Sequence, residues 1–487
     1  MKNRGSRAND LSRRAALKGM AAIAALHAAP SLLAQVTPAV LMERPAPNKR
    51  LFRSPAVEEA IATVKRDIAD PDLAQTFENC LPNTLDTTVF PGTRDGKPDT
   101  FVITGDIDAM WLRDSAAQVW PYLAFAGGDP KLALLVEGVI HRHAHCILLD
   151  PYANAFTRRA SDPVLSWAAH DETEHRPGVA ERKWEMDSLS YPLRLAYGYW
   201  KATGNKAVFD AEWTESARTI LKTYREQQRK SEQGPYSFKR MSDNPTESLA
   251  ANGYGNPARP VGMIDSMFRS SDDAAAYSMS VPGNLFAVVA LRSLAEIARD
   301  ALGDRALAGD AQSLSDEVAA ATQAFGRTTH PRHGEVWAYE VDGFGNALMM
   351  DDPGQPGLLN LPFLGCCPAS DALYLRTRGY SLSDDNPYFV RGSAGEGLSS
   401  PHAGRDFIWP MAIVSRALTS TDDREIAASL HILRNTNAGT HFMHESFYKD
   451  DATRYTRPWF AWANGLFGEL ILNLHRDRPH LLRRSYA

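Results

Sequence analysis

The stretch Pro282-Gly-Asn-Leu285-Phe-Ala-Val288-Val-Ala-Leu291-Arg-Ser-Leu-Ala295-Glu-Ile-Ala298 carries the pattern that decides the fold. Its apolar residues recur at the spacing of one face of an α-helix, and proline suits the first turn of such a helix. Similar patterns recur along most of the chain, separated by long loops rich in glycine and proline. We therefore expect a mostly helical protein.

Roughly a dozen helices are expected in this way, whereas strand signals are few. One strand is expected within residues 333–341, followed by a turn at Asp342-Gly343. No sequence repeat and no linker divides the chain, so we predict an all-α (α/α)6 toroid, six helical hairpins closed in a ring. A two-domain helical protein is the alternative. The further helices are expected at residues 55–70, 115–126, 130–149, 184–202, 206–230, 310–324, 408–419, 424–435 and 459–475.

Length and composition exclude several classes of protein. The 487 residues are 44% hydrophobic and 23% charged, which excludes a disordered chain, and glycine does not recur at every third position as collagen requires. Length alone suggests about three domains, although ring-shaped folds of this size form one unit. The formal net charge of −5 gives no electrostatic reason to expect a nucleic-acid partner.

Residues 1–34 have the features of a twin-arginine export signal. Arg13-Arg14 precedes a weakly hydrophobic run that is shorter than the roughly 20 residues of a membrane span. A frayed amphipathic helix is the alternative. We expect a Pro-rich leader at residues 35–54 and a single (α/α)6 domain at 55–487, in a protein that is periplasmic or secreted.

Signal removal changes the charge of the protein. The segment holds six basic residues and one acid, a net of +5, so the remaining chain carries −10. No other segment approaches 18 uninterrupted apolar residues, and we expect no membrane contact after removal of the signal. The four cysteines, Cys80, Cys146, Cys366 and Cys367, are too few for a disulfide scaffold; we expect mostly buried thiols, with one disulfide possible.

Motifs for several common chemistries are absent from the sequence. There is no Gly-rich phosphate loop, no dinucleotide-binding Gly-x-Gly-x-x-Gly after a strand and no Gly-x-Ser-x-Gly elbow. His141, His143 and His145 form the one tempting metal cluster, but no acid lies between them as in metalloproteases. We expect these histidines to be structural or exposed, and we expect no metal and no cofactor.

Five clusters near predicted helix ends combine carboxylates with aromatic or basic side chains, and five of the ten tryptophans lie in or beside them. An indole face stacks on a sugar ring, and Asp and Arg bind its hydroxyls. Glycoside hydrolysis also needs two carboxyl groups. Taken singly, each cluster has an ordinary explanation: Asp114 as an N-cap, Asp-Asp pairs in solvent, or tryptophan in the core. The clusters lie at residues 104–115, 183–188, 267–273, 401–410 and 443–462.

The stretches Gly105-Asp-Ile-Asp-Ala-Met-Trp-Leu-Arg-Asp-Ser115 and His444-Glu-Ser-Phe-Tyr-Lys-Asp-Asp451, with residues 268–291 and 459–464, resemble glycoside hydrolase family 125, the exo-α-1,6-mannosidases. The resemblance covers residues 55–474. It implies an (α/α)6 fold and a metal-independent, inverting attack on a terminal α-1,6-linked mannose, with an α-mannoside oligosaccharide or glycan as substrate.

The resemblance also implies the catalytic pair, with Asp272 as general acid and Glu445 as general base. The residues alone do not choose between Asp272 and Asp273; they indicate only that one points inward, since neighbours on a helix diverge by about 100°. Inversion requires the two carboxyl groups to stand roughly 6.5–9.5 Å apart. From chemistry and motif membership, the candidates for the mannose pocket are Trp111, Arg113, Asp114, Trp184, Asp187 and His402.

Two departures from the family pattern affect substrate contacts. Pro353-Gly-Gln-Pro-Gly357 replaces a segment in which the family has an asparagine, and Ser270 stands where the family has proline. The reaction type is expected to be unchanged. The alternatives are another (α/α)6 glycosidase of different linkage specificity and a carbohydrate-binding protein without turnover, which would not need both Asp272 and Glu445.

Overall fold

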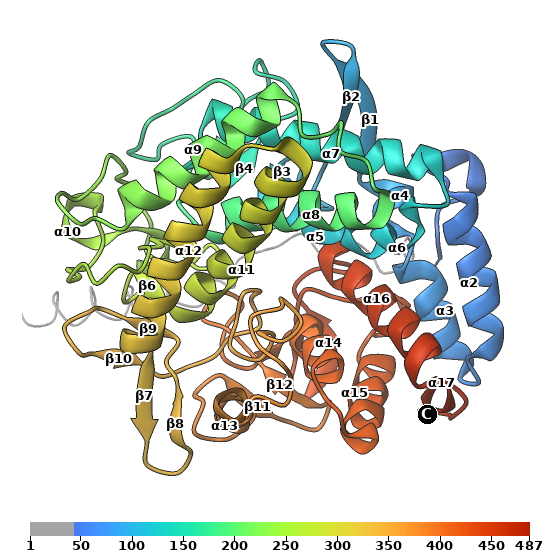
Figure 1. Ribbon diagram of the computed structural model, residues 1–487. Helices are drawn as coiled ribbons and strands as arrows, with labels where there is room; N and C mark the ends of the chain where they lie inside the picture. The colour runs from blue at the N-terminus through green and yellow to red at the C-terminus, as the bar shows by residue number, and fades with distance from the viewer. Residues whose placement is uncertain (1–42) are drawn as a thin grey trace, which may run out of the picture. The chain divides into compact units, whose positions relative to one another are not determined.

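A computed structural model of the protein describes residues 43–487, in which inner and outer helices alternate along the chain (Figure 1). The expected export signal and residues 35–42 of the leader lie outside the described residues. Burial distinguishes the two positions: every residue of α5 (Leu112–Val119) is buried, whereas α12 (Arg305–Phe325) buries 7 of its 21 residues. The inner position therefore faces other elements all round, and the outer position has a solvent face.

The inner helices pack on one another in chain order. α5 contacts α8, α8 contacts α11, and α14 contacts α16. Between α11 and α14 the inner position is taken by an irregular segment, residues 357–366, rather than by a helix. Besides α5, the inner helices are α8 (Asp187–Thr203), α11 (Val281–Ile297), α14 (Pro410–Leu418) and α16 (Ala461–Asp477).

The outer helices cover this ring and close it. α16 packs on both α5 and α3, so the end of the chain meets its beginning (Figure 1). The fold is an (α/α)6 toroid, as the sequence predicts. The outer helices are α3 (Pro71–Cys80), α7 (Pro130–Leu149), α9 (Ala211–Gln227), α12, α13 (Ala372–Ser381) and α15 (Asp423–Asn435). Shorter or flanking helices are α2 (Pro55–Asp67), α4 (Asn83–Thr87), α6 (Leu123–Ala126), α10 (Ala250–Gly253) and α17 (Pro479–Leu482).

Capping residues in the sequence explain where several helices begin. The Asp129 carboxylate accepts hydrogen bonds from the amides of Lys131 and Leu132, with Pro130 in the first turn of α7. Ser280 caps α11 by accepting from the Gly283 amide at 3.2 Å. Such caps satisfy amides that have no partner within the helix.

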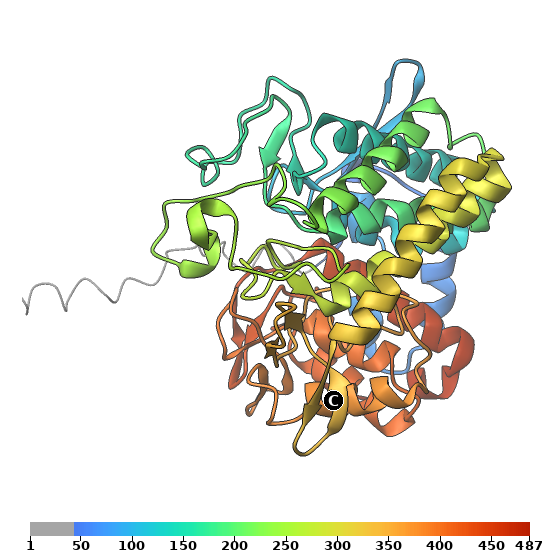
Figure 2. The same ribbon diagram turned by 60° about the vertical axis from the view of Figure 1, so that its left-hand side comes forward.

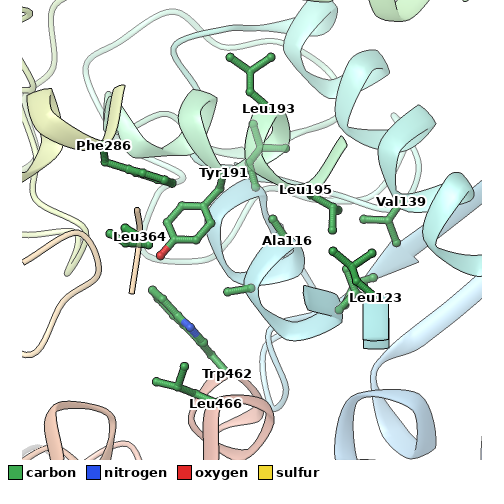
Figure 3. Close-up of a cluster of buried hydrophobic side chains, with 14 of the residues drawn as sticks. Ala116, Leu123, Val139, Tyr191, Leu193, Leu195, Phe286, Leu364, Trp462 and Leu466 are labelled. Carbon is green, nitrogen blue, oxygen red and sulfur yellow. The ribbon is translucent and has the colours of Figure 1, made fainter. Parts of the chain in front are cut away.

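Aromatic and aliphatic side chains from the inner helices meet in the centre of the ring (Figure 3). Tyr191 of α8 packs edge-on against Phe286 of α11, with ring centroids 5.0 Å apart, and against Trp462 of α16 at 6.0 Å. Leu364 of the irregular segment lies beside them (Figure 3). Residues 357–366 therefore supply the apolar contacts of a sixth inner helix without being helical.

The expectation of few strands is wrong: residues 43–487 contain fifteen short ones. Most have only two to four residues, too few for an alternating pattern to be recognised. The predicted strand at 333–341 corresponds to β8 (Gly334–Trp337) and β9 (Glu340–Val341). Three antiparallel two-stranded sheets are β1 (Val89–Arg94) with β2 (Lys97–Val102), β7 (Arg327–His330) with β8, and β11 (Phe389–Arg391) with β12 (Glu396–Leu398).

Three further sheets of three strands each join the loops that lead into the inner helices. Figure 2 shows that the long loops of residues 150–186 and 228–280 gather on one side of the helices. These sheets fix the loops relative to one another. They are β3 (Met110–Trp111), β4 (Ala155–Phe156) and β5 (Val179–Glu181); β6 (Met279–Ser280), β9 and β10 (Ala347–Leu348); and β13 (Phe407–Ile408), β14 (Phe447–Tyr448) and β15 (Asp451–Tyr455).

Two features of the core bear on the sequence expectations. Within residues 43–487, α7 and residues Val281–Leu302 are long and apolar enough to cross a membrane, but most of each is buried inside the protein. All four cysteines are free thiols: Cys80 and Cys146 are buried, while Cys366 and Cys367 are half-buried. Burial raises the pKa of all four thiols, which keeps them protonated.

Candidate active site

The candidate residues lie in segments that lead into inner helices, or in the first turns of those helices. Because these helices alternate with outer helices that run back, their N-terminal ends gather at one mouth of the ring. The partial positive charge of a helix N-terminus also favours carboxylates there. The segments are Trp111–Asp114 at α5, residues 183–187 at α8, residues 268–280 at α11, residues 402–409 at α14 and residues 444–460 at α16.

Asp272 lies in a tight turn before α11 with φ +65°, a left-handed conformation that is uncommon outside glycine and asparagine. Arg113 donates to its carboxylate at 3.2 Å, and Asn154 donates to the same oxygen at 3.4 Å. The Lys183 ammonium donates to its backbone carbonyl at 2.8 Å. Contacts from three separate segments thus hold the turn in this strained form.

Asp273 occupies a different environment, although neither acid lies on a helix as the sequence argument assumed. Its carboxylate accepts from the Thr246 hydroxyl at 3.1 Å and lies 3.4 Å from His402 Nδ1. The Asp273 side chain is 1% exposed and that of Asp272 is 25% exposed. Asp272 is therefore the carboxyl group that can reach a substrate. The tight turn, and not the angle between neighbours on a helix, points the two side chains in different directions.

Arg113 is the centre of a buried charge cluster. Its guanidinium donates to Glu185 at 2.5 Å and to Asp272, and it lies 3.5 Å from both Asp114 and Asp187. Three buried carboxyl groups and the partly exposed Asp272 thus surround one cation. Arg113 cannot neutralise all of them, so part of the cluster must hold protons.

The pKa directions within the cluster show which groups hold protons. Burial raises the pKa of Glu185 well above its usual range. Burial also favours protonation of Asp272, but a hydrogen bond from Glu185 and the charges of Arg113, Lys183 and His402 outweigh it and lower the pKa of Asp272. Burial raises the pKa of Asp187 to about 6. These directions favour a protonated Glu185 beside an ionised Asp272.

Glu445 has another set of partners. Arg457 donates to one carboxylate oxygen at 3.1 Å, and the Thr456 hydroxyl donates to the other at 2.9 Å. Arg457 also forms an ion pair with Asp106 from the loop before α5. One donor on each oxygen fixes the orientation of the Glu445 carboxylate.

His402 lies within electrostatic range of both candidate catalytic carboxyl groups, Asp272 and Glu445. Burial would lower its pKa, but the hydrogen bond and charge of Asp273, with the charges of Glu445 and Asp272, raise its pKa to about 9. His402 is therefore a cation at neutral pH. It lies beside Trp409, with ring centroids 6.2 Å apart.

Several buried polar atoms at this mouth have no hydrogen-bond partner among residues 43–487. Two are indole N–H donors, on Trp111 and Trp409, and two are carboxylate oxygens, on Asp114 and Asp187. Buried polar groups are normally paired, so unpaired donors and acceptors that converge on a mouth suit a ligand rich in hydroxyl groups.

The tryptophans divide between core and site. Trp184 is fully buried, and its indole N–H donates to the Asp265 carbonyl at 2.8 Å, so it presents no face to a sugar. Trp462 packs in the centre of the ring (Figure 3). Trp459 is partly exposed and lies against Gly105, where an added Cβ would stand 3.1 Å from the indole.

The three neighbouring histidines of α7 each face a partner within the protein. His141 bonds the Pro98 carbonyl, His143 bonds the Ser115 hydroxyl, and His145 faces Glu212. Among residues 43–487, one group could hold a metal by ligand spacing, namely His330, His333 and Asp385. There Asp385 already pairs with His333 at 2.8 Å and with Arg332, and these ion pairs account for the cluster.

The two departures from the family pattern meet in space. An added Cβ at Gly354 would stand 2.4 Å from the Ser270 hydroxyl and 2.9 Å from the Asp352 carboxylate. The glycine therefore lets the loop at residues 353–357 approach the turn that carries Asp272.

Several residues of this site are not among the sequence candidates. Glu185 and Arg457 lie inside the clusters that sequence inspection found, and their charge beside tryptophan was the available signal. Lys183 also lies inside a cluster, and Asp273 is the neighbour that the sequence left open beside Asp272. Asn154 lies outside every cluster and is recruited by its contact with Asp272. No local pattern distinguishes Asn154 from a surface asparagine.

The fold and the two carboxyl environments define the class of protein, a glycoside hydrolase built on an (α/α)6 ring. The chain matches the family described as metal-independent α-mannosidases, GH125, over residues 70–472. It belongs to this family, as the resemblance predicts.

Two relatives illustrate the match. The Meiotically up-regulated gene 157 protein of Schizosaccharomyces pombe is 40% identical over 460 residues, covering 91% of this chain and 90% of that protein. A metal-independent α-mannosidase from Streptococcus pneumoniae, solved in a non-productive complex with α-1,6-mannobiose, is 40% identical with a TM-score of 0.83. That match covers 88% of this chain and all of the streptococcal chain.

Proposed function

We propose that the protein removes non-reducing terminal α-1,6-linked mannose from a glycan with inversion at the anomeric carbon. Asp272 is the general acid and Glu445 the general base. The α-1,6 linkage is supported by the mannobiose bound to the streptococcal relative. The observation that carries the mechanism is the contrast between the two carboxyl environments.

The acid side can deliver a proton to the leaving group. Arg113 contacts both Glu185 and Asp272, and the pKa directions favour a proton on Glu185. When a glycosidic oxygen approaches Asp272, the proton moves from Glu185 to Asp272 and then to that oxygen. The departing sugar leaves as a neutral alcohol, and the Glu185–Asp272 pair recovers its proton from solvent.

The base side activates water. Glu445, held by Arg457 and Thr456, takes a proton from a water molecule whose oxygen bonds to the anomeric carbon on the face opposite the departing oxygen. The bond from the anomeric carbon to the glycosidic oxygen breaks at the same time. An α-mannoside thus gives β-mannose.

Proton NMR of the first-formed product tests this mechanism. β-Mannose should appear before mutarotation equilibrates the two anomers. An α product would mean retention of configuration and would exclude Glu445 as the base of a single displacement.

A linkage panel tests the substrate. The protein should release mannose from α-1,6-mannobiose and leave the α-1,2-, α-1,3- and α-1,4-linked isomers largely intact. Preference for another linkage or another sugar would favour a related (α/α)6 glycosidase. Binding of mannobiose without any hydrolysis would favour a carbohydrate-binding protein.

We further propose that residues 1–34 direct export by the twin-arginine route to the periplasm or beyond. The twin arginine before a short apolar run supports this proposal. A variant with Arg13→Lys and Arg14→Lys should stay inside the cell while the wild type is exported. Equal distribution of the two proteins would contradict it.

A further inference from the structure

Trp167 has an unusually exposed side chain for a tryptophan: 47% of its surface is accessible. It lies in the loop between β4 and β5, outside the sequence clusters that suggested a sugar site. Its indole N–H donates to Glu181 at 3.1 Å, which restricts rotation of the ring. An exposed but tethered indole is a preorganised stacking surface.

The backbone around Trp167 is also fixed. The Leu165 amide donates to the Ala180 carbonyl at 3.3 Å, and the Ala168 amide donates to the Leu165 carbonyl at 2.9 Å. Leu165 packs on the small cluster that includes Trp111 and Ala155, and Ala168 is buried. The loop therefore packs on the sheet that carries Trp111 into the site.

Glu181 connects Trp167 to the acid side of the mouth. One Glu181 oxygen accepts from Trp167, and the other accepts from Asn154 at 3.0 Å. The same Asn154 amide lies 3.4 Å from the Asp272 carboxylate. One carboxylate and one amide thus separate the exposed indole from the general acid.

A second loop holds this arrangement in place. Arg240 donates to Glu181 at 2.8 Å and forms a bidentate pair with Asp171, with both distances 2.7 Å. The neighbouring residue Glu247 accepts from Lys183, which in turn holds the Asp272 carbonyl. The Trp167 loop, the Arg240 loop and the Asp272 turn form one connected rim.

We propose that Trp167 is the stacking platform for the sugar that departs, and so contributes to the subsite on the leaving-group side of the bond. This inference rests on the proposed function. The general acid protonates the glycosidic oxygen, so the departing sugar lies beyond Asp272, whereas Glu445 faces the opposite side of the cleaved mannose. The ligand is a pyranose joined through the bond that is cleaved, or the next pyranose along the chain.

The experiment compares two substrates in the full-length enzyme. α-1,6-Mannotriose places sugars on the leaving-group side, whereas α-mannosyl fluoride has no sugar there and needs no proton from Asp272. Trp167→Ala should lower kcat/KM for mannotriose by about five- to tenfold and leave that for the fluoride unchanged. Trp167→Phe, which keeps an aromatic face, should stay within about twofold of wild type on both substrates.

Leu134→Ala is the matched control, because Leu134 is also exposed but lies on the outer helix α7. This variant should leave kcat/KM unchanged for both substrates. Equal losses on both substrates in Trp167→Ala, or no loss on mannotriose, would overturn the proposal. If the wild type hydrolyses neither substrate, the proposed function fails; titration of mannotriose into wild type and Trp167→Ala then decides the subsite, with unchanged Kd refuting it.

Discussion

Replacing Asp272 by asparagine separates proton donation from every other role of this side chain. Asparagine has nearly the same size and tolerates the left-handed φ of +65° better than most residues. Its amide oxygen can still accept from Arg113 and Asn154, which now contact the carboxylate at 3.2 and 3.4 Å. Arg113 also keeps Glu185 at 2.5 Å, so the cation is not left unpaired.

The size of the effect follows from what is removed. A positioned general acid contributes about 10²- to 10⁴-fold to a rate. Because the contacts of residue 272 are conserved, little binding should be lost, and this factor should appear in kcat. Asp272→Asn should therefore lower kcat for α-1,6-mannobiose by about 10²- to 10⁴-fold, with KM within about threefold.

The assay uses two substrates with different needs. Fluoride leaves without protonation, so turnover of α-mannosyl fluoride by Asp272→Asn should stay within about threefold of wild type. Glu445→Gln should lose hydrolysis of both substrates, because both reactions need an activated water molecule. Thermal denaturation of each variant checks that the fold is intact.

Two results would refute this reasoning. Near-normal hydrolysis of mannobiose by Asp272→Asn would remove Asp272 from the acid role. An equal loss on mannobiose and the fluoride would mean that Asp272 positions the substrate or the ring instead of donating a proton.

Three further predictions concern pH, packing and metals. The pKa of His402 is raised from 6.5 to about 9, so its charge should stabilise the fold fully below about pH 6.5 and lose this effect as pH rises through about 9. The Tm of the wild type should therefore fall between pH 7 and 10, and the Tm of His402→Gln should fall less. An equal fall in both proteins would contradict this. Gly138→Ala should cost about 1–3 kcal/mol in chemical denaturation, because the new Cβ would stand 2.4 Å from the Thr100 hydroxyl and 2.8 Å from its amide nitrogen. Gly309→Ala, with open space around it, should instead be neutral or stabilise by about 0.5–1 kcal/mol; similar losses in both would exclude packing as the cause. Chelator should leave hydrolysis unchanged, and a loss restored by added metal would give the His141–His145 segment or the His330 cluster a role.

The helix boundaries show how much of the fold the local sequence pattern predicts. The predicted segment 130–149 coincides with α7, and 282–298 differs from α11 by one residue at each end. α13 was not predicted, because only 4 of its 10 residues are buried and its apolar residues therefore mark no clear face. Residues 184–202 were expected to be helical throughout, but α8 begins at Asp187. Lys183 and Glu185, just before it, are instead bound by Glu247 and Arg113.

By itself, the sequence determined the helical period, the closed ring and the family, because these depend on local spacing and on continuous motifs. The tertiary structure decided how the charges are grouped. Arg113 and Asp272 are 159 residues apart in the chain and meet across the mouth, and the turn that exposes Asp272 buries Asp273. A periodic pattern reports which face of a segment is buried, but a pKa depends on which distant charges are buried with it.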